Sequence, residues 1–294
     1  MPGFASIDDM VSEITTAGKF RYLPFTRTVY TGATSAAGRW HDCFQAAGTG
    51  GVGALTGSAG VGVALDSATT GALPLSPATV TSDLRFLLSM MAVTPGTTVV
   101  PAVLMLTDFL YKYPVCVVTG TPTTLNNGAG KPSRFGGGVG VMASGIVTTT
   151  AIGAASPLLT ITYTNSTPTG SRTGVLAAMV ASSPLGSCFG GVAVAATLGG
   201  PFMTMAAGDS GVSQLDSYVI TSGPTTGTVS FVLHKPIAFM PLTAANVAGE
   251  RDFIFQLPSF PKIEDSACLG FLIQIGGATV VNQVVVGNLA LGWG

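Results

Sequence analysis

The hydrophobic positions near the N-terminus predict one amphipathic helix. Ile7, Val11 and Ile14 recur at helical spacing and share one face. Ser6 suits the N-cap of this helix, and Gly18 suits a C-terminal stop. We therefore expect a helix over residues 6–17. A helix this short is marginal alone, so its apolar face must pack on other structure.

An aromatic and basic segment follows this helix. It reads KFRYLPFTRTVY over residues 19–30 and includes Phe20, Tyr22 and Phe25. This composition is typical of an extended arm that lies on the chain's own core or on a neighbouring subunit. We expect the helix and the arm together to occupy residues 1–39.

From residue 40 onward the pattern is that of β-strands. Short runs rich in Val, Ile and Thr, such as LLTITYTN and CLGFLIQIGG, alternate with turns rich in Gly, Pro, Asn and Ser. Regular short strands of this kind predict a mainly β fold with sandwich or jelly-roll-like domains. The apolar run over residues 84–93 fits either a short helix or a buried strand, because periodicity alone does not separate them.

Composition shifts along the chain indicate two β-rich units. We expect a first β domain over residues 40–118, a Gly-, Pro- and Asn-rich linker over 119–137, and a second β-sandwich domain over 138–242. The last stretch, residues 243–294, is expected to return and complete a sheet of the first domain.

The composition narrows the class of protein. Hydrophobic residues make up 47% of the chain and charged residues only 9%, far below the roughly 25% of a typical soluble domain. A net charge of −1 with scattered Lys and Arg argues against nucleic acid as a partner. A membrane-spanning helix needs about 20 consecutive apolar residues, and Pro95, Gly96 and Pro101 interrupt the best candidate. The acidic N-terminus does not resemble a signal peptide, so we expect a cytosolic protein with no membrane partner.

The low fraction of charged residues also indicates that parts of the protein's surface are covered by other subunits. The cores of protein interfaces are depleted in charged residues, so the composition favours a subunit of an assembly, with homo-oligomerisation expected, over a free enzyme.

The charged residues that do occur gather late in the chain. Glu250, Arg251, Asp252, Lys262, Glu264 and Asp265 fall within the segment GERDFIFQLPSFPKIED, whereas Arg172 is the one charged residue between positions 136 and 208. Aromatic side chains lie among these charges. The segment is expected either to contact a partner or to cross the chain's own core. The candidate partner-binding residues, in the helix, the arm and this segment, are Ile7, Val11, Ile14, Phe20, Tyr22, Phe25, Arg251, Phe253, Phe255, Phe260 and Lys262.

No motif in the sequence predicts a cofactor or a metal. GTGGVG over residues 48–53 matches a dinucleotide motif by letters, but a Gly-broken stretch follows it in place of a helix. GAGKPS over residues 128–133 departs from the phosphate-loop pattern and is typical of a turn. Cys43, Cys116, Cys188 and Cys268 lack metal-ligand spacing, so we expect four buried free thiols.

One catalytic alternative comes from the segment GDSGV, residues 208–212, which resembles the nucleophile segment of chymotrypsin-like serine proteases. His41, then Asp83 or Asp108, then Ser210 occur in the chain order of that family's catalytic residues. Val212 stands where that family has a glycine. We therefore assign no catalytic residue, and we expect His234 to be a surface or hydrogen-bonded histidine.

Several segments together resemble a known family. They are SIDDMVSEITTAGKFRY, GRWHDC, AAGDSGV, KPIAFMPLT, GERDFIFQLPSFPKIEDSACLGFL and the terminal GWG. In this order they resemble virion structural proteins of tailed bacteriophages. The resemblance implies a capsid decoration or cement protein, located in the virion after assembly in the host bacterial cytoplasm. Its implied partners are the major capsid protein or other virion subunits. Major capsid, tail-tube and minor tail proteins remain alternatives, and no catalytic residue is implied.

Overall fold

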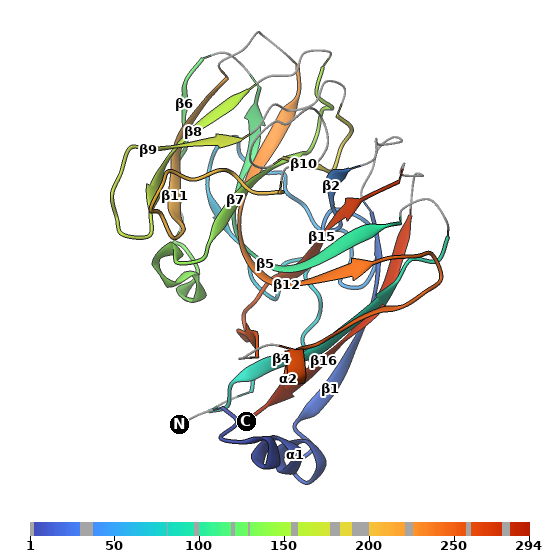
Figure 1. The fold of residues 1–294 in the computed structure, drawn as a ribbon. Helices are drawn as coiled ribbons and strands as arrows, with labels where there is room; N and C mark the ends of the chain where they lie inside the picture. Colours follow the sequence, from blue (N-terminus) through green and yellow to red (C-terminus); the bar gives the residue numbers. More distant parts are fainter. Residues whose placement is uncertain are drawn as a thin grey trace.

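The computed structural model confirms a mainly β fold with a short N-terminal helix (Figure 1). It describes residues 3–29, 38–80, 82–96, 100–118, 121–128, 130–153, 158–176, 183–189, 200–220, 226–256, 260–277 and 283–294. In chain order the elements are α1 (Ile7–Thr15), β1 (Phe20–Thr28), β2 (Arg39–Asp42), β3 (Val63–Ala64), β4 (Arg85–Val93), β5 (Ala102–Val117), β6 (Thr123–Thr124), the 3₁₀ helix η1 (Ser133–Gly138), β7 (Met142–Val147), β8 (Leu159–Asn165), β9 (Arg172–Leu176), β10 (Ser187–Phe189), β11 (Val212–Ile220), β12 (Thr228–Leu242), β13 (Gly249–Asp252), α2 (Phe253–Gln256), β14 (Lys262–Ile263), β15 (Leu269–Ile275) and β16 (Val284–Trp293).

The centre of the molecule is a closed ring of strands. Its order is β5, β12, β7, β10, β2 and β15, and β15 pairs back to β5. Met105, Phe109, Val232 and Leu272 fill the inside of this barrel. Because β5 is covered on both faces, its sequence is an almost continuous apolar run, as buried strands require.

A second sheet packs against the lower half of the barrel. Its order is β1, β16, β4 and β13, and β14 also pairs with β4. Phe25 and Leu289 of this sheet pack in one cluster with Leu104 and Phe271 of the barrel. The ambiguous run over residues 84–93 is therefore a strand, because β4 hydrogen-bonds to neighbours on both sides.

A third sheet covers the upper half of the barrel. Its order is β6, β11, β8 and β9. Ile161 and Leu215 of this sheet pack with Leu110 and Phe231 of β5 and β12. The long strands β5 and β12 therefore run through both apolar clusters and pair along nearly their whole length.

The strand pairing also shows how the C-terminal residues and the predicted linker connect to the rest of the fold. Strands β13 to β16, from the last fifty or so residues, pair with β1, β2, β4 and β5. Residues 119–137, predicted as a linker, contain β6 and the start of η1. Arg134 of η1 is ion-paired to Asp108 of β5 at 2.7 Å, so this segment is tied to the barrel.

The N-terminal helix begins at the predicted N-cap and ends two residues before the predicted boundary at residue 17. The Ser6 hydroxyl accepts a hydrogen bond from the Asp9 amide at 3.0 Å, and α1 ends before Gly18, which has a φ of 65°. A positive φ favours glycine, so Gly18 suits the turn that follows the helix. The Gly3 amide donates to the carbonyl of Gly294 at 2.8 Å, so the two ends of the chain lie side by side below the barrel (Figure 1).

Candidate interaction surface

The charge-rich segment forms one edge of the lower sheet. Its β13 part pairs with residues 89–92 of β4, and its β14 part pairs with Arg85 and Phe86. Between these strands the chain leaves the edge and forms the single turn α2. The segment is therefore a strand edge with one helical projection.

Of the two phenylalanines in α2, one is buried in the core and the other is exposed to solvent. Phe253 is 2% exposed and packs in the cluster between the lower sheet and the barrel. Phe255 is 78% exposed. Residues two apart on one helical turn point to different sides, so Phe253 belongs to the chain's own core and Phe255 is exposed to solvent.

The helix α1 has its apolar side chains on two faces. Met10 is 5% exposed and packs with Leu88 and Ala290, and Ile14 joins the same cluster. Ile7 is 57% exposed and Val11 49% exposed. Met10 is the contact that the sequence analysis missed, although it lies one helical turn before Ile14 and its spacing gave the signal.

The arm is strand β1 at the other edge of the lower sheet. Phe25 is 2% exposed and belongs to the chain's own core. Tyr22 is 65% exposed, and its ring meets Phe20 edge-on at 4.7 Å between centroids. The predicted partner residues Phe25 and Phe253 are therefore not available at the surface of this structure.

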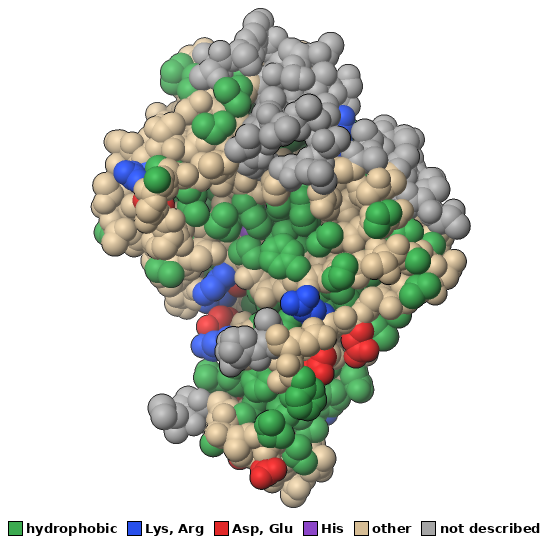
Figure 2. Space-filling view, in the orientation of Figure 1, with side chains coloured by type: hydrophobic (Ala, Val, Ile, Leu, Met, Phe, Trp, Pro, Cys, Tyr) green, Lys and Arg blue, Asp and Glu red, His purple; other side chains and the backbone are tan. Residues whose placement is uncertain are grey.

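The exposed side chains Ile7, Val11, Tyr22 and Phe255 belong to α1, β1 and α2, elements whose other side chains pack in one apolar cluster, and we call these four residues the α1–α2 surface. The cluster beneath them contains Met10, Leu88 and Ala290, with Phe4, Ile14, Phe20, Phe86, Ile254 and Phe260 packed against it. Figure 2 shows hydrophobic side chains gathered on this lower part of the molecule, in the region of α2 and α1. An exposed group of this kind is typical of a protein contact.

Of the two charged candidates in this segment, Lys262 is ion-paired within the chain, whereas Arg251 Nε has no hydrogen-bond partner among the described residues. Lys262 pairs with Glu264 at 2.8 Å, and both side chains are 44% exposed. Arg251 lies in β13, partly buried. Lys19 pairs with Glu13 at 2.8 Å and Asp83 at 2.9 Å, which raises the pKa of Lys19 through the hydrogen bonds to these carboxylates.

The residues of the protease alternative are held in separate places. The Ser210 hydroxyl bonds to the Ser166 hydroxyl at 2.9 Å on the surface of the upper sheet. His41 lies in β2 of the barrel, between β10 and β15. Asp108 binds Arg134, and Asp83 binds Lys19. Each acid already has a cationic partner, and the structure does not assemble the triad.

Asp209, beside Ser210, organises the turn that carries both residues. Its carboxylate accepts hydrogen bonds from Tyr163, from Asn165 at 2.8 Å and from Arg172 at 3.0 Å. These bonds lower the pKa of Asp209 to about 2. The segment GDSGV is thus a turn fixed by its aspartate.

His234 is buried inside the barrel. Its Nε2 lies 2.7 Å from the Ser144 hydroxyl, and the side chain is 0% exposed. Burial lowers the pKa of His234 to about 3, because the charged imidazolium would lose its hydration. This neutral histidine matches the expectation of a hydrogen-bonded residue.

The Gly-rich motifs serve as packed loops. Gly50 has a φ of 89°, and a Cβ there would lie 2.0 Å from the carbonyl oxygen of Ala72. Lys131 of GAGKPS donates to the carbonyl of Ser213.

The four cysteines are buried free thiols, as expected.

Within the described ranges, no group of three or more His, Cys, Asp and Glu side chains is placed to hold a metal ion. Among the same residues, no helix has the length and apolarity needed to cross a membrane.

Comparison of this chain with protein-family models, with curated proteins and with solved structures gives no match.

Proposed function

We propose that this protein is a structural subunit of a tailed-phage virion that attaches to the head as a decoration or cement protein. The observation that carries the proposal is the α1–α2 surface. Ile7, Val11, Tyr22 and Phe255 are all about half or more exposed, on three elements that contribute to one apolar cluster, in a chain with 9% charged residues. The resemblance of the sequence segments to virion proteins supplies the identity of the partner.

Apolar burial is the expected basis of attachment. Exposed ion pairs such as Lys262–Glu264 contribute about 0–1 kcal/mol and are screened by salt. Apolar contact contributes about 25 cal/mol per Å² and is not weakened by sodium chloride. Phe255 is the best-placed anchor, because aromatic side chains dominate interface hot spots.

The test measures the fraction of protein that remains on purified particles across a sodium chloride series. We expect the parent to stay bound at high salt and Phe255→Ser to lose most of its occupancy. Phe239→Ser is the matched control, since Phe239 is 48% exposed on β12, outside the α1–α2 surface.

Two results would contradict the proposal. One is release of the parent protein by moderate salt, which would indicate charge-driven binding. The other is equal occupancy of Phe255→Ser and Phe239→Ser, which would place the contact elsewhere. A protein that never copurifies with particles would remove the virion assignment altogether.

A further inference from the structure

An amine, a carboxamide and a carboxylate meet beside the first half of β11. Lys131, which lies just before η1, donates from Nζ to the Gln214 side chain, with 3.3 Å between Nζ and Oε1. Gln214 Nε2 donates in turn to the Asp216 carboxylate at 2.7 Å. The three groups are therefore in contact, although Lys131 and Gln214 are 83 residues apart in the sequence.

Strand β11 presents Gln214 and Asp216 on the outer face of the upper sheet. Leu215, between them, is fully buried, whereas Gln214 and Asp216 are partly exposed. Successive side chains of a strand point to opposite faces, so these two share one face. Thr164 of the neighbouring strand β8 donates from Oγ1 to Asp216 Oδ2 at 2.9 Å. The carboxylate is thus held from both sides.

The Lys131 amine is held in this position by two further contacts. Its Nζ donates to the carbonyl of Ser213 and lies 5.2 Å from the centroid of the Phe135 ring. Burial lowers the pKa of Lys131, although the nearby Asp216 carboxylate acts to raise it. A lowered pKa increases the fraction of neutral amine, the form with a free electron pair, and desolvation is one way in which proteins activate lysine as a nucleophile.

We propose that Lys131 and Gln214 join in an isopeptide bond within the folded chain, with Asp216 as the proton carrier. The electron pair of Lys131 Nζ forms a bond to Gln214 Cδ, the bond from Cδ to Nε2 breaks, and Nε2 leaves as ammonia. The Asp216 carboxylate takes the proton that the attacking nitrogen loses and gives it to Nε2. One amide replaces another, so the reaction needs no oxidant, reductant or cofactor.

The folded structure favours this reaction by holding the groups together. Groups oriented within one molecule can react as if at an effective concentration of roughly 10⁵–10⁸ M. The ammonia diffuses away, which opposes the reverse reaction. The bond connects β11 of the upper sheet to the segment before η1, and Arg134 of η1 is ion-paired to the barrel. This crosslink does not depend on the α1–α2 surface or on attachment to a particle.

Intact-mass spectrometry of the purified protein tests the reaction. We expect the parent to be lighter than its sequence mass by one molecule of ammonia. Lys131→Arg lacks the nucleophilic amine and Gln214→Glu lacks the ammonia leaving group, so both should keep the full mass of their sequences. Lys235→Arg, at an exposed lysine of β12, is the matched control and should lose ammonia like the parent.

Cyanogen bromide cleavage locates the bond. Met142 and Met205 lie between Lys131 and Gln214, so cleavage after methionine places the two reacting residues on separate fragments. These fragments should remain joined in the parent and separate in Lys131→Arg. Far-ultraviolet circular dichroism should give the same β-dominated spectrum for both proteins, because Lys131 is only partly buried.

The role of Asp216 is tested by the rate at which the bond forms. A positioned proton carrier contributes roughly 10²–10⁴-fold to a rate. In Asp216→Asn we therefore expect the joined fraction, followed over time after synthesis, to increase at least tenfold more slowly than in the parent. Formation at the parent rate would overturn the role of Asp216.

Two other results would overturn the isopeptide bond itself. A parent protein with its full sequence mass would show that the amine and the carboxamide do not react. Loss of ammonia with fragments that separate would indicate a different reaction, such as succinimide formation at Asn127, which precedes Gly128.

Discussion

At the residue scale, the few charges of this chain are used to hold loops against sheets. Arg27 is 1% exposed and donates to the carbonyls of Ala46 at 3.3 Å and Gly51 at 2.8 Å. Lys112 donates to the carbonyls of Ala54 at 2.6 Å and Thr56 at 3.0 Å. Burial lowers the pKa of both cations, because these carbonyl bonds only partly replace the hydration that the cations lose.

The buried Arg134–Asp108 pair should contribute far more to stability than the exposed Lys262–Glu264 pair. Arg134→Met leaves the Asp108 carboxylate buried without its cation, and we expect a loss of about 3–5 kcal/mol in the free energy of unfolding. Lys262→Met is the control, with an expected change of about 0–1 kcal/mol. Urea denaturation measures both values, and losses of equal size would contradict this account.

Buried His234 and Asp42 should make opposite contributions to the pH dependence of stability. Burial lowers the pKa of His234 from 6.5 to about 3 and raises that of Asp42 from 3.8 to about 6. Between about pH 4 and 6, unfolding lets His234 bind a proton and lets Asp42 release one. The two contributions then cancel, because each changes the free energy of unfolding by about 1.4 kcal/mol per pH unit with opposite sign.

Single substitutions should reveal the two contributions. In His234→Gln only Asp42 remains, so stability relative to the parent should rise as pH falls from 6 to 4. In Asp42→Asn only His234 remains, and relative stability should fall over the same range. Urea denaturation at several pH values gives the differences from the parent. Curves parallel to that of the parent would show that these groups do not titrate as described.

At the scale of elements, α1 is stabilised by what it covers. Its N-cap and first-turn acids favour the helix, yet a helix of nine residues needs tertiary contact. That contact passes through Met10 onto Leu88 and Ala290. The exposed Ile7 and Val11 add nothing to this packing, which leaves them free for the α1–α2 surface.

Met10→Ala should therefore release the helix, whereas Val11→Ala should not. Loss of a buried methionine side chain costs about 2–5 kcal/mol, and surface substitutions usually stay within about 0.5 kcal/mol. Amide hydrogen exchange in residues 10–16 is the measurement. We expect Met10→Ala to lose protection there while the barrel strands keep theirs. Equal protection in both variants would show that the helix does not depend on Met10.

At the scale of the whole molecule, β5 and β12 connect the two halves. Leu104 and Met240 lie in the lower cluster, whereas Leu110 and Phe231 lie in the upper one. The halves of each strand cannot separate without breaking the pairing of these two strands, which runs from Ala102 to Val117. The barrel is thus common to both apolar clusters.

We expect one cooperative unfolding transition despite the division of the core into clusters. Differential scanning calorimetry should give a calorimetric enthalpy equal to the van't Hoff enthalpy. Far-ultraviolet circular dichroism should follow the same curve, with a spectrum dominated by β-structure. Two separate transitions would show that residues 138–242 unfold as an independent unit.

The sequence by itself determined the fold class and the local structure. Alternating Val, Ile and Thr with Gly and Pro turns dictates strands, and Ser6 and Gly18 mark the N-cap of α1 and the turn after it. These features follow from backbone preferences and short-range periodicity, which act within a few residues.

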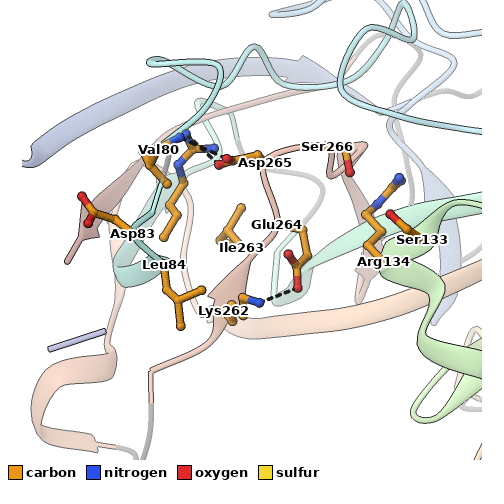
Figure 3. A pocket seen from close by; sticks show the side chains of 11 residues that line it. Val80, Asp83, Leu84, Ser133, Arg134, Lys262, Ile263, Glu264, Asp265 and Ser266 are labelled. Carbon is orange, nitrogen blue, oxygen red and sulfur yellow. Dashed lines mark hydrogen bonds and ion pairs between the residues drawn. The ribbon is translucent and has the colours of Figure 1, made fainter. Parts of the chain in front are cut away.

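Only the tertiary structure decided which side chains face solvent and which distant residues meet. The sequence pattern does not distinguish Phe253 from Phe255, because their exposure depends on where α2 leaves the edge of β4. One pocket is lined by residues of three distant segments, among them Arg85, Arg134 and Lys262 (Figure 3), and the barrel closes through strand pairs far apart in the chain. Such contacts arise from long-range strand pairing, for which local periodicity carries no information.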